Sequence, residues 1–324
     1  MTFEQILQTI SSELTTFETH FDIMLTSEVS IIHSIIAHIN TNRGKRLRPS
    51  VMFLIANVLG KVNNRLMDDA AMIEILHTAT LIHDDIVDEA TQRRNQKSIN
   101  ARWDSKVAVL MGDFLYTKAF MPAFKNEEYE FLHIVSHAAE LMSEGELLAI
   151  QLSETLDVSE EQYYRIINAK TASLIAAACQ TSAMVYSENE VIIDTFREYG
   201  RNVGMAFQMK DDIFDYSDNA SVIGKPVGND IREHKLTLPL IHALSIATDS
   251  KRSEILDLIR QEDISDNDVK QVVNFAISNN GIEVALTKAA EYANAAIKSL
   301  DIIPDSKEKD CLIGFAKYMY QREK

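Results

Sequence analysis

Residues 84–88 read DDIVD, residues 211–215 read DDIFD, and each pentapeptide ends a strongly apolar segment with helical spacing. In a helix of about 100° per residue, the first and last aspartates of each pentapeptide lie on one face, one turn apart. Like charges repel at this spacing, and carboxylates at the C-terminal end of a helix also oppose its dipole. Both pentapeptides therefore predict a bound cation that compensates these costs.

The two pentapeptides together predict a magnesium site. Carboxylates are hard oxygen ligands, and Mg²⁺ usually takes one or two of them together with waters and substrate phosphates. We expect the two helix ends to face each other and to form a cage for a metal-bound diphosphate. A solvated acidic helix end is the alternative for one DDxxD, but two copies with the same spacing and apolar filler weaken it. The expected metal ligands are Asp84, Asp88, Asp211 and Asp215.

The composition predicts an all-α fold. The chain has 324 residues, of which 46% are hydrophobic, with only 10 glycines and 5 prolines. Glycine and proline punctuate turns and break helices, so their scarcity favours long uninterrupted helices. No linker or low-complexity tract divides the chain, and we expect a single domain over residues 1–324. Helical spacing recurs over 3–20, 22–40, 47–59, 66–88, 102–123, 128–150, 159–187, 190–216, 237–248, 251–261, 266–279, 282–301 and 306–321.

The charge and the apolar stretches narrow the possible partners. A formal net charge of −16 argues against nucleic acid, because phosphate backbones need a basic face. The N-terminal residues MTFEQILQ lack the basic and apolar regions of a signal peptide. The most apolar stretch, 174–185, is shorter than the roughly 20 apolar residues of a membrane span. We therefore expect a cytoplasmic protein without a stable membrane anchor, in which Cys179 and Cys311 are buried reduced thiols.

Basic and polar side chains lie close in sequence to both acidic pentapeptides, where they could bind phosphate. Arginine binds phosphate with a two-pronged fork, and lysine acts as a point charge. His77 precedes Asp84 by seven residues on the same helical stripe, and Gln208 precedes the second pentapeptide by three. Surface patches, a core histidine and an interhelical hydrogen bond are the plain alternatives. The cationic candidates are Lys45, Arg46 and Arg48 before the third helix, Arg93 and Arg94 after the first pentapeptide, Lys170 beside Thr171, and Lys225 and Lys235 in the stretch 217–235.

With these motifs together, the sequence resembles the trans-isoprenyl diphosphate synthases, also called polyprenyl synthetases. The matching text runs in the family's order and spacing from Gly44 to Pro239. It consists of GKRLRP (44–49), HTATLIHDDIVDEATQRR (77–94), AVLMGDFL (108–115), EGELLAIQ (144–151), KTASL (170–174), GMAFQMKDDIFD (204–215), GKPVGND (224–230) and KLTLP (235–239). The resemblance implies an all-α isoprenoid-synthase bundle around a central apolar cavity, and usually a homodimer.

The resemblance also implies a role for each candidate. The four aspartates already named would hold Mg²⁺ around the allylic diphosphate. Isopentenyl diphosphate would be bound by Lys45, Arg48, His77 and Arg94. The allylic diphosphate would be bound by Arg93, Lys170, Thr171, Gln208, Lys225 and Lys235. The residues expected to act on the leaving group are Asp84, Asp88, Asp211, Lys170 and Lys225.

Three loop positions depart from the family pattern. Arg43 stands where the first glycine of GGKRLRP is usual, Asn95 follows the two arginines where glycine is frequent, and His234 replaces the glycine of EGK. None of these changes removes a charged ligand, so they affect loop geometry rather than the chemistry.

The reaction that the resemblance implies is a dissociative alkylation. Metal ions and basic side chains neutralise the leaving diphosphate, so that the C–O bond ionises to an allylic cation. Apolar walls shield this cation from water. The double bond of isopentenyl diphosphate attacks it, and a proton is then lost, with diphosphate as the base.

The length of the product depends on the helix that precedes Asp84. In the family, a bulky aromatic residue five positions before the first aspartate stops growth early, and Ala79 stands there, with Ile75 one turn further back. Helical spacing places Thr80 rather than Ala79 directly below the aspartate, and both are small. One turn of about 5.4 Å matches roughly one isoprene unit. Because both residues are small, we expect an all-trans product of roughly C30 to C50, made from farnesyl or geranylgeranyl diphosphate. Ala79 could instead simply pack on a neighbouring helix, and the candidates for the tunnel floor are Phe114 and Phe120.

Three alternatives stay open at this level. They are a short-chain synthase making about C15 to C20, a terpene synthase, and a noncatalytic partner subunit of a synthase. Terpene cyclases usually lack the second full DDxxD and the basic loop, and partner subunits tend to lose an acidic motif. Both motifs are intact here, which favours the synthase.

Overall fold

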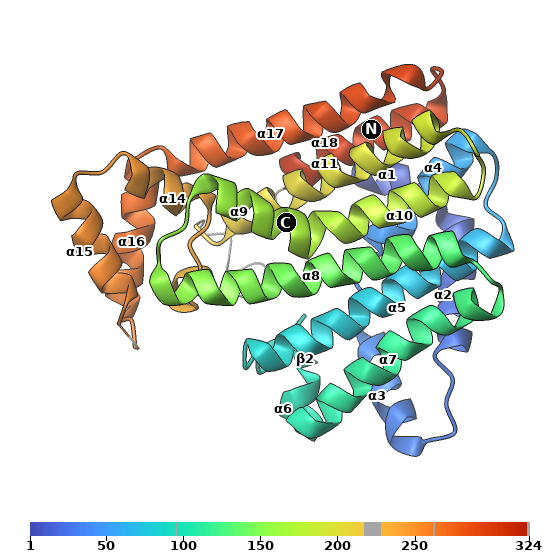
Figure 1. Cartoon of the computed structure of the whole chain (residues 1–324), viewed down its shortest axis with the longest axis horizontal. Helices are drawn as coiled ribbons and strands as arrows, with labels where there is room; N and C mark the ends of the chain where they lie inside the picture. Colours follow the sequence, from blue (N-terminus) through green and yellow to red (C-terminus); the bar gives the residue numbers. More distant parts are fainter. Residues whose placement is uncertain (95, 217–227, 262, 323–324) are drawn as a thin grey trace. The chain divides into compact units, whose positions relative to one another are not determined.

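Residues 1–94, 96–216, 228–261 and 263–322 are described by a computed structural model of the protein, and they are almost wholly helical (Figure 1). The predicted all-α class is therefore confirmed. Two compact units divide the chain, and both are assembled from separate segments. The first contains Met1–His137, Ala177–Arg197 and Ile303–Phe315, and the second contains Ala138–Ala176, Glu198–Ile302 and Ala316–Lys324. A single domain over the whole chain stays a prediction.

The first unit is organised around the long helix α5 (Asn64–Val87), which packs along α7 (Ser105–Lys125) and also contacts α2, α4 and α6 (Figure 1). The side chain of Asn63 caps α5 by accepting from the N–H of Leu66 at 2.9 Å. Every residue from Ala70 to Leu76 is buried, whereas the last turns of the helix are only partly buried. The other elements of this unit are α1 (Phe3–Gln8), α2 (Ser11–Met24), α3 (Ser30–Thr41), α4 (Leu47–Leu59) and α6 (Ile99–Trp103).

A short antiparallel hairpin follows α5 and was not predicted. Its strands are β1 (Gln92–Arg93) and β2 (Gln96–Lys97), with Arg93 opposite Gln96 in the register. Arg94 has a φ of 50°, in the left-handed region that tight turns require. The two arginines that follow the first acidic pentapeptide therefore lie on this hairpin.

The second unit has an apolar core to which α14 (Leu238–Ser245), α16 (Asp266–Ser278) and α17 (Gly281–Ser299) contribute. Helix α14 packs against both of the others. The remaining elements of this unit are α9 (Glu160–Ile167), α13 (Asn229–Arg232), α15 (Asp249–Ile259) and a 3₁₀ turn (Leu300–Ile302). Four further helices contribute to both units: α8 (Tyr129–Thr155), α10 (Ser173–Met184), α11 (Glu190–Phe214) and α18 (Lys307–Gln321).

A five-residue π-helical segment, Asn168–Ala172, joins α9 to α10. Two glycines allow neighbouring helices to approach it closely. A Cβ at Gly145 of α8 would lie 2.7 Å from Cβ of Ala169, and a Cβ at Gly204 of α11 would lie 2.5 Å from Cα of Ala172. These approaches bring α8 and α11 next to the segment that carries Lys170 and Thr171. π-Helical turns of this kind often mark functional sites.

The predicted helices are largely confirmed, but three expected segments are each divided into two helices. The expected segment 3–20 is broken between α1 and α2, where the hydroxyl of Thr9 donates to the carbonyl of Ile6 at 2.7 Å. The expected segment 22–40 is broken where Thr26 bonds to the carbonyl of Ile23 at 2.9 Å. The expected segment 102–123 is divided by a residue with a φ of 112°, Asp104, which caps α7.

Candidate active site

The first acidic segment lies at the end of α5. Its middle aspartate, Asp85, is buried and accepts a hydrogen bond from Nε of Arg93 at 2.6 Å. Asp88 is the C-cap residue, and its N–H donates to the carbonyl of Asp84 at 2.8 Å. Asp84 is half-buried and Asp88 is exposed. The two predicted metal ligands are therefore the more accessible aspartates, while Asp85 holds the hairpin.

The basic loop between α3 and α4, residues 42–46, is joined to the hairpin. Nη1 of Arg94 donates to the carbonyl of Asn42 at 3.3 Å, and the side-chain amide of Asn42 donates back to the carbonyl of Arg94. A Cβ at Gly44 would lie 2.5 Å from this guanidinium, so a larger residue would displace it. The structure thus brings together two predicted substrate-binding segments that are about fifty residues apart in the chain.

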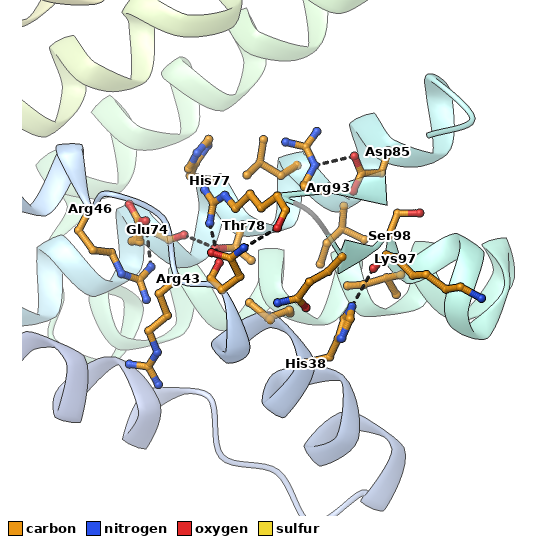
Figure 2. A pocket seen from close by; sticks show the side chains of 17 residues that line it. His38, Arg43, Arg46, Glu74, His77, Thr78, Asp85, Arg93, Lys97 and Ser98 are labelled. Atoms are coloured by element: carbon orange, nitrogen blue, oxygen red, sulfur yellow. Dashed lines mark hydrogen bonds and ion pairs between the residues drawn. The ribbon is translucent and has the colours of Figure 1, made fainter. Parts of the chain in front are cut away.

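A pocket with a cavity volume of about 80 Å³ lies among this loop, α5 and the hairpin (Figure 2). Figure 2 shows the Arg46–Glu74 ion pair on one side and the Arg93–Asp85 ion pair on the other. The lining is partly cationic and partly apolar. The cationic side chains are Arg43, Arg46, Arg93, Arg94 and Lys97, and the apolar ones are Ile39, Leu81, Ile82 and Ile99. Of the residues predicted to bind isopentenyl diphosphate, His77 and Arg94 line this pocket, whereas Lys45 and Arg48 do not.

His77 and Arg48 each have a buried nitrogen without a hydrogen-bond partner in the described part of the chain: Nδ1 of His77 and Nε of Arg48. Burial and the nearby arginines hold the pKa of His77 well below its usual range, so its ring is neutral at neutral pH. Burial also lowers the pKa of Arg48, against the attraction of Glu74. A buried donor without an acceptor is costly. Nε of Arg48 is therefore suited to a ligand that brings acceptor oxygens, and so is Nδ1 of His77 in the tautomer that carries the proton there.

The second acidic segment lies at the end of α11, and again its middle aspartate is the most buried. Asp212 accepts a hydrogen bond from the hydroxyl of Tyr163 at 2.7 Å and from the side-chain amide of Gln208 at 2.8 Å. Burial raises the pKa of Asp212 to about 6, although these hydrogen bonds oppose the shift. Asp211 and Asp215 are only half-buried.

The outer aspartates of this segment have partners of their own. Asp211 accepts a hydrogen bond from Nη2 of Arg322 at 2.7 Å, and the guanidinium of Arg322 lies 4.1 Å from the ring centre of Phe207. The two carboxylate oxygens of Asp215 accept from the first two N–H groups of α13 at 2.9 and 3.0 Å. Asp215 thus anchors the start of α13 in this conformation.

The predicted ligands of the allylic diphosphate in this unit are held by polar contacts. Lys170 forms an ion pair with Glu146 of α8. The hydroxyl of Thr171 donates to Gln208 at 2.7 Å, which is the interhelical bond considered as the plain alternative for Gln208. Lys235 forms an ion pair with Glu233 at 2.7 Å. Lys225 lies outside the described residues.

Three residues near the candidate ligands were missed by the sequence analysis. Tyr163 lies seven residues before Lys170, about two helical turns away, a spacing that could have indicated it. Glu146 lies within the quoted motif EGELLAIQ, so its position was available although its partner was not. Arg322 lies near the C-terminus, where no motif points to it.

The predicted chain-length residues are placed on α5. Ala79 and Ile75 are fully buried, and the half-buried Thr80 donates its hydroxyl to the carbonyl of His77 at 2.9 Å. Helix α7, which packs along α5, carries the two candidate floor residues, Phe114 and Phe120. A tunnel wall at Ala79 stays a prediction, as does the central apolar cavity.

Three further features concern metal ligands, apolar helices and cysteines. Within the described ranges, no three His, Cys, Asp or Glu side chains converge to hold a metal ion. Helix α7 has the length and apolar composition of a membrane span, and 33% of its apolar window is buried. Cys179 and Cys311 are both buried and unbridged, as expected.

Comparisons with known proteins agree with the resemblance. Residues 29–276 match the family described as Polyprenyl synthetase. Octaprenyl diphosphate synthase of Escherichia coli (strain K12) is 36% identical over 300 residues, which are 93% of each chain. The crystal structure of a polyprenyl synthase from Caulobacter crescentus CB15, complexed with calcium and isoprenyl diphosphate, matches with a TM-score of 0.93 and 31% identity over 99% of this chain and 98% of that one.

A decaprenyl diphosphate synthase from Rhodobacter capsulatus matches with the same TM-score of 0.93, at 31% identity over 99% of both chains. The all-α fold is thus shared over almost the whole length. The chain belongs to the polyprenyl synthetase family.

Proposed function

We propose that the protein is a Mg²⁺-dependent trans-polyprenyl diphosphate synthase, which condenses isopentenyl diphosphate with an allylic diphosphate and releases diphosphate. The observation that carries this proposal is the pair of buried nitrogens on Arg48 and His77 that have no partner among the described residues, both close enough to Arg94 of the hairpin to interact with its charge. A diphosphate supplies the acceptor oxygens that these nitrogens lack. The adjacent pocket has cationic and apolar walls, which suit an anionic head and a short hydrocarbon tail.

The donor set of the two acidic helix ends fits Mg²⁺. Asp84 and Asp88 would hold it on α5, and Asp211 and Asp215 on α11. Water and substrate phosphate would complete the coordination, which is what Mg²⁺ prefers. When bound, the metal supplies positive charge to the departing diphosphate.

Two separate sets of side chains would bind the two substrates. Lys45, Arg48, His77 and Arg94 would bind isopentenyl diphosphate. Because His77 is neutral, it can donate a hydrogen bond without adding to the charge of the surrounding arginines. The allylic diphosphate would be bound by Arg93, Lys170, Thr171, Gln208, Lys225 and Lys235.

The lysines and arginines among these residues would stabilise the negative charge that develops on the diphosphate as the allylic C–O bond breaks. The π electrons of isopentenyl diphosphate then form the new C–C bond, and the resulting cation loses a proton to the released diphosphate. The apolar side chains near the acidic helix end would exclude water from the intermediate cation. No serine, cysteine or histidine nucleophile is required.

We further propose a long product made from farnesyl or geranylgeranyl diphosphate. Two observations support it: the similarity to octaprenyl and decaprenyl diphosphate synthases, and the small, fully buried side chain at Ala79. A short-chain synthase making about C15 to C20 is the alternative, and product analysis separates the two.

We also propose that the enzyme is a cytoplasmic homodimer in which α7 contributes to the contact. The inward face of α7 packs on α5, so the helix is already part of a protein core. Its other face exposes large apolar side chains, among them Leu110 at 68% and Phe124 at 58%. An exposed apolar face on a helix whose other face is packed in the core is typical of a protein–protein interface.

The test is incubation of the purified protein with labelled isopentenyl diphosphate, farnesyl diphosphate and Mg²⁺, followed by chain-length analysis. The expected result is a ladder that ends at roughly C30 to C50 and disappears with EDTA. A stop at about C15 to C20 would support the short-chain alternative. Absence of incorporation with every allylic primer would overturn the proposal and indicate a noncatalytic subunit.

A further inference from the structure

Two carboxylates of α2 hold the basic loop, residues 42–46, through two arginines. Arg43 forms an ion pair with Glu18 and donates from Nη2 to both carboxylate oxygens of Asp22, at 2.6 and 2.7 Å. Arg46 donates to Glu18 from Nε at 2.8 Å and from Nη2 at 3.1 Å. Glu18 therefore joins both arginines, and Asp22, one turn further along α2, reinforces one of them.

Arg46 is anchored on two further sides. Its Nη1 donates to Glu74 of α5 at 2.9 Å, and its guanidinium lies 4.4 Å from the ring centre of Phe21 on α2. Its side chain is only 9% exposed. Burial works to lower the pKa of Arg46, but Glu18 and Glu74 raise it above its ordinary value, so the side chain stays charged.

The backbone of the loop needs such support. Arg46 has a φ of 51°, a left-handed conformation that costs a residue with a side chain about 1–2 kcal/mol. It is the N-cap residue of α4, and no side-chain hydrogen bond caps that helix. The ion pairs and the aromatic contact of Arg46 therefore hold α4 and the loop in a conformation that the backbone alone does not favour.

The arginines of this region serve two different purposes. The charges of Arg43 and Arg46 are matched by carboxylates of α2 and α5, although both side chains line the pocket. Arg48, two residues beyond Arg46, instead keeps a buried nitrogen without a partner in the described ranges. Arg43 adds a second link between the loop and α2 through its hydrogen bonds to Asp22.

We propose that Glu18 and Asp22 are positioning residues for isopentenyl diphosphate, acting through Arg43 and Arg46 to hold the basic loop so that Arg48 is preorganised for the diphosphate. This inference rests on the proposed function. A loop that is already ordered loses less conformational freedom when the ligand binds, so the contacts strengthen binding without touching the ligand. Their loss therefore raises the KM for isopentenyl diphosphate more than it lowers kcat.

The test is a steady-state comparison of Glu18→Gln and Asp22→Asn with the unmodified enzyme. Glu18→Gln keeps the shape of the side chain and removes the charge shared by both arginines. We expect it to raise the KM for isopentenyl diphosphate about tenfold, or about 1.4 kcal/mol, with kcat and the KM for the allylic substrate within about twofold. Asp22→Asn leaves Glu18 in place, so we expect a smaller rise of about threefold.

The matched control is Glu254→Gln on α15, which removes a carboxylate paired with Lys251 at 2.6 Å in a helix that carries none of the candidate ligands. Its KM values should equal those of the unmodified enzyme. A merely structural role for Glu18 would lower the active fraction, and hence kcat, without a change in KM, and that result would overturn the inference. If Glu18→Gln does not fold, the test rests on Asp22→Asn. An unchanged KM for isopentenyl diphosphate in that variant also overturns the inference.

A second measurement separates this inference from the proposed function. Calorimetric titration with inorganic diphosphate requires no turnover, and we expect weaker binding by Glu18→Gln than by the unmodified protein. An unmodified protein that incorporates no isopentenyl diphosphate contradicts the proposed function. An active unmodified protein, together with equal diphosphate binding by Glu18→Gln, contradicts the positioning role alone.

Discussion

At the residue scale, the middle aspartates of the two acidic segments have the same structural task. Asp85 accepts from Arg93 at 2.6 Å, and Asp212 accepts from Tyr163 at 2.7 Å. Both carboxylates are buried, whereas the outer aspartates of each segment are more accessible. In each segment, the middle aspartate thus holds a neighbouring part of the chain, and the two outer aspartates are less buried.

Arg48 gives the sharpest residue-scale prediction. Its buried Nε has no hydrogen-bond partner among the described residues, and lysine would replace the guanidinium fork with a single point charge. We expect Arg48→Lys to raise the KM for isopentenyl diphosphate by about tenfold or more, with a smaller effect on the allylic KM. The control is Arg165→Lys on the exposed surface of α9. A normal KM in Arg48→Lys would remove Arg48 from the substrate site.

Asp69, near the start of α5, predicts a pH dependence of stability. It is 1% exposed, and burial together with the charge of Glu128 raises its pKa to about 8 from an ordinary value of 3.8. Between these two values the folded protein holds a proton that the unfolded chain has lost. The free energy of unfolding therefore falls as pH rises through this window and levels off above it.

Asp69→Asn removes this titration, so its free energy of unfolding should decline less between about pH 5 and pH 8. The measurement is urea unfolding at several pH values. The difference in slope should approach one proton, or about 1.4 kcal/mol per pH unit. Asp301→Asn, at an exposed position, serves as the control. Parallel pH profiles for Asp69→Asn and the unmodified protein would contradict the assignment.

At the scale of elements, the π-helical segment depends on two close helix approaches. Gly204→Ala would place a methyl group 2.5 Å from the backbone of Ala172. Alanine favours helices over glycine, yet this overpacking should destabilise the protein by about 1–3 kcal/mol. Gly314→Ala is the matched control, because its methyl group meets only the flexible end of Ile6, at 2.8 Å. Thermal unfolding compares the two, and equal melting temperatures would argue against a rigid contact at the π segment.

Helix α5 connects the candidate diphosphate site to the proposed product tunnel. If Ala79 lines the tunnel, Ala79→Tyr should block it and shorten the product to about C15 to C20. Chain-length analysis of the products is the measurement, with Ala101→Tyr on the exposed surface of α6 as the control. An unchanged product length in a folded Ala79→Tyr variant would mean that Ala79 only packs against its neighbours.

At the scale of the whole molecule, the outer face of α7 predicts an association. Leu110→Glu places a charge on a residue that is 68% exposed, so the single chain should tolerate it while a dimer should not. We expect sedimentation to show a dimer for the unmodified protein and a shift towards the monomer for the variant. Ile246→Glu, at 58% exposure after α14, is the control. A dimer that persists in Leu110→Glu would place the interface elsewhere.

The sequence by itself determined what depends on local spacing. Composition and periodicity predicted the helical class, and α4, α5, α11, α17 and α18 begin and end within a few residues of their expected bounds. The repeated DDxxD motifs and the basic segments identified the family. They can be recognised in the sequence because neighbouring residues encode both the helical repeat and the spacing within each motif.

Only the tertiary structure decided which charged side chains pair with one another. Glu18 meets Arg43 and Arg46, and Asp211 meets Arg322, across 111 residues of sequence. The π-helical segment, the hairpin and the helix breaks likewise depend on contacts or on backbone angles that no periodic pattern contains. Local spacing specifies which face of a helix a side chain occupies, but packing between distant segments decides what that face contacts. The sequence therefore sufficed to propose the reaction, whereas the support of the basic loop by α2 emerged only from the folded chain.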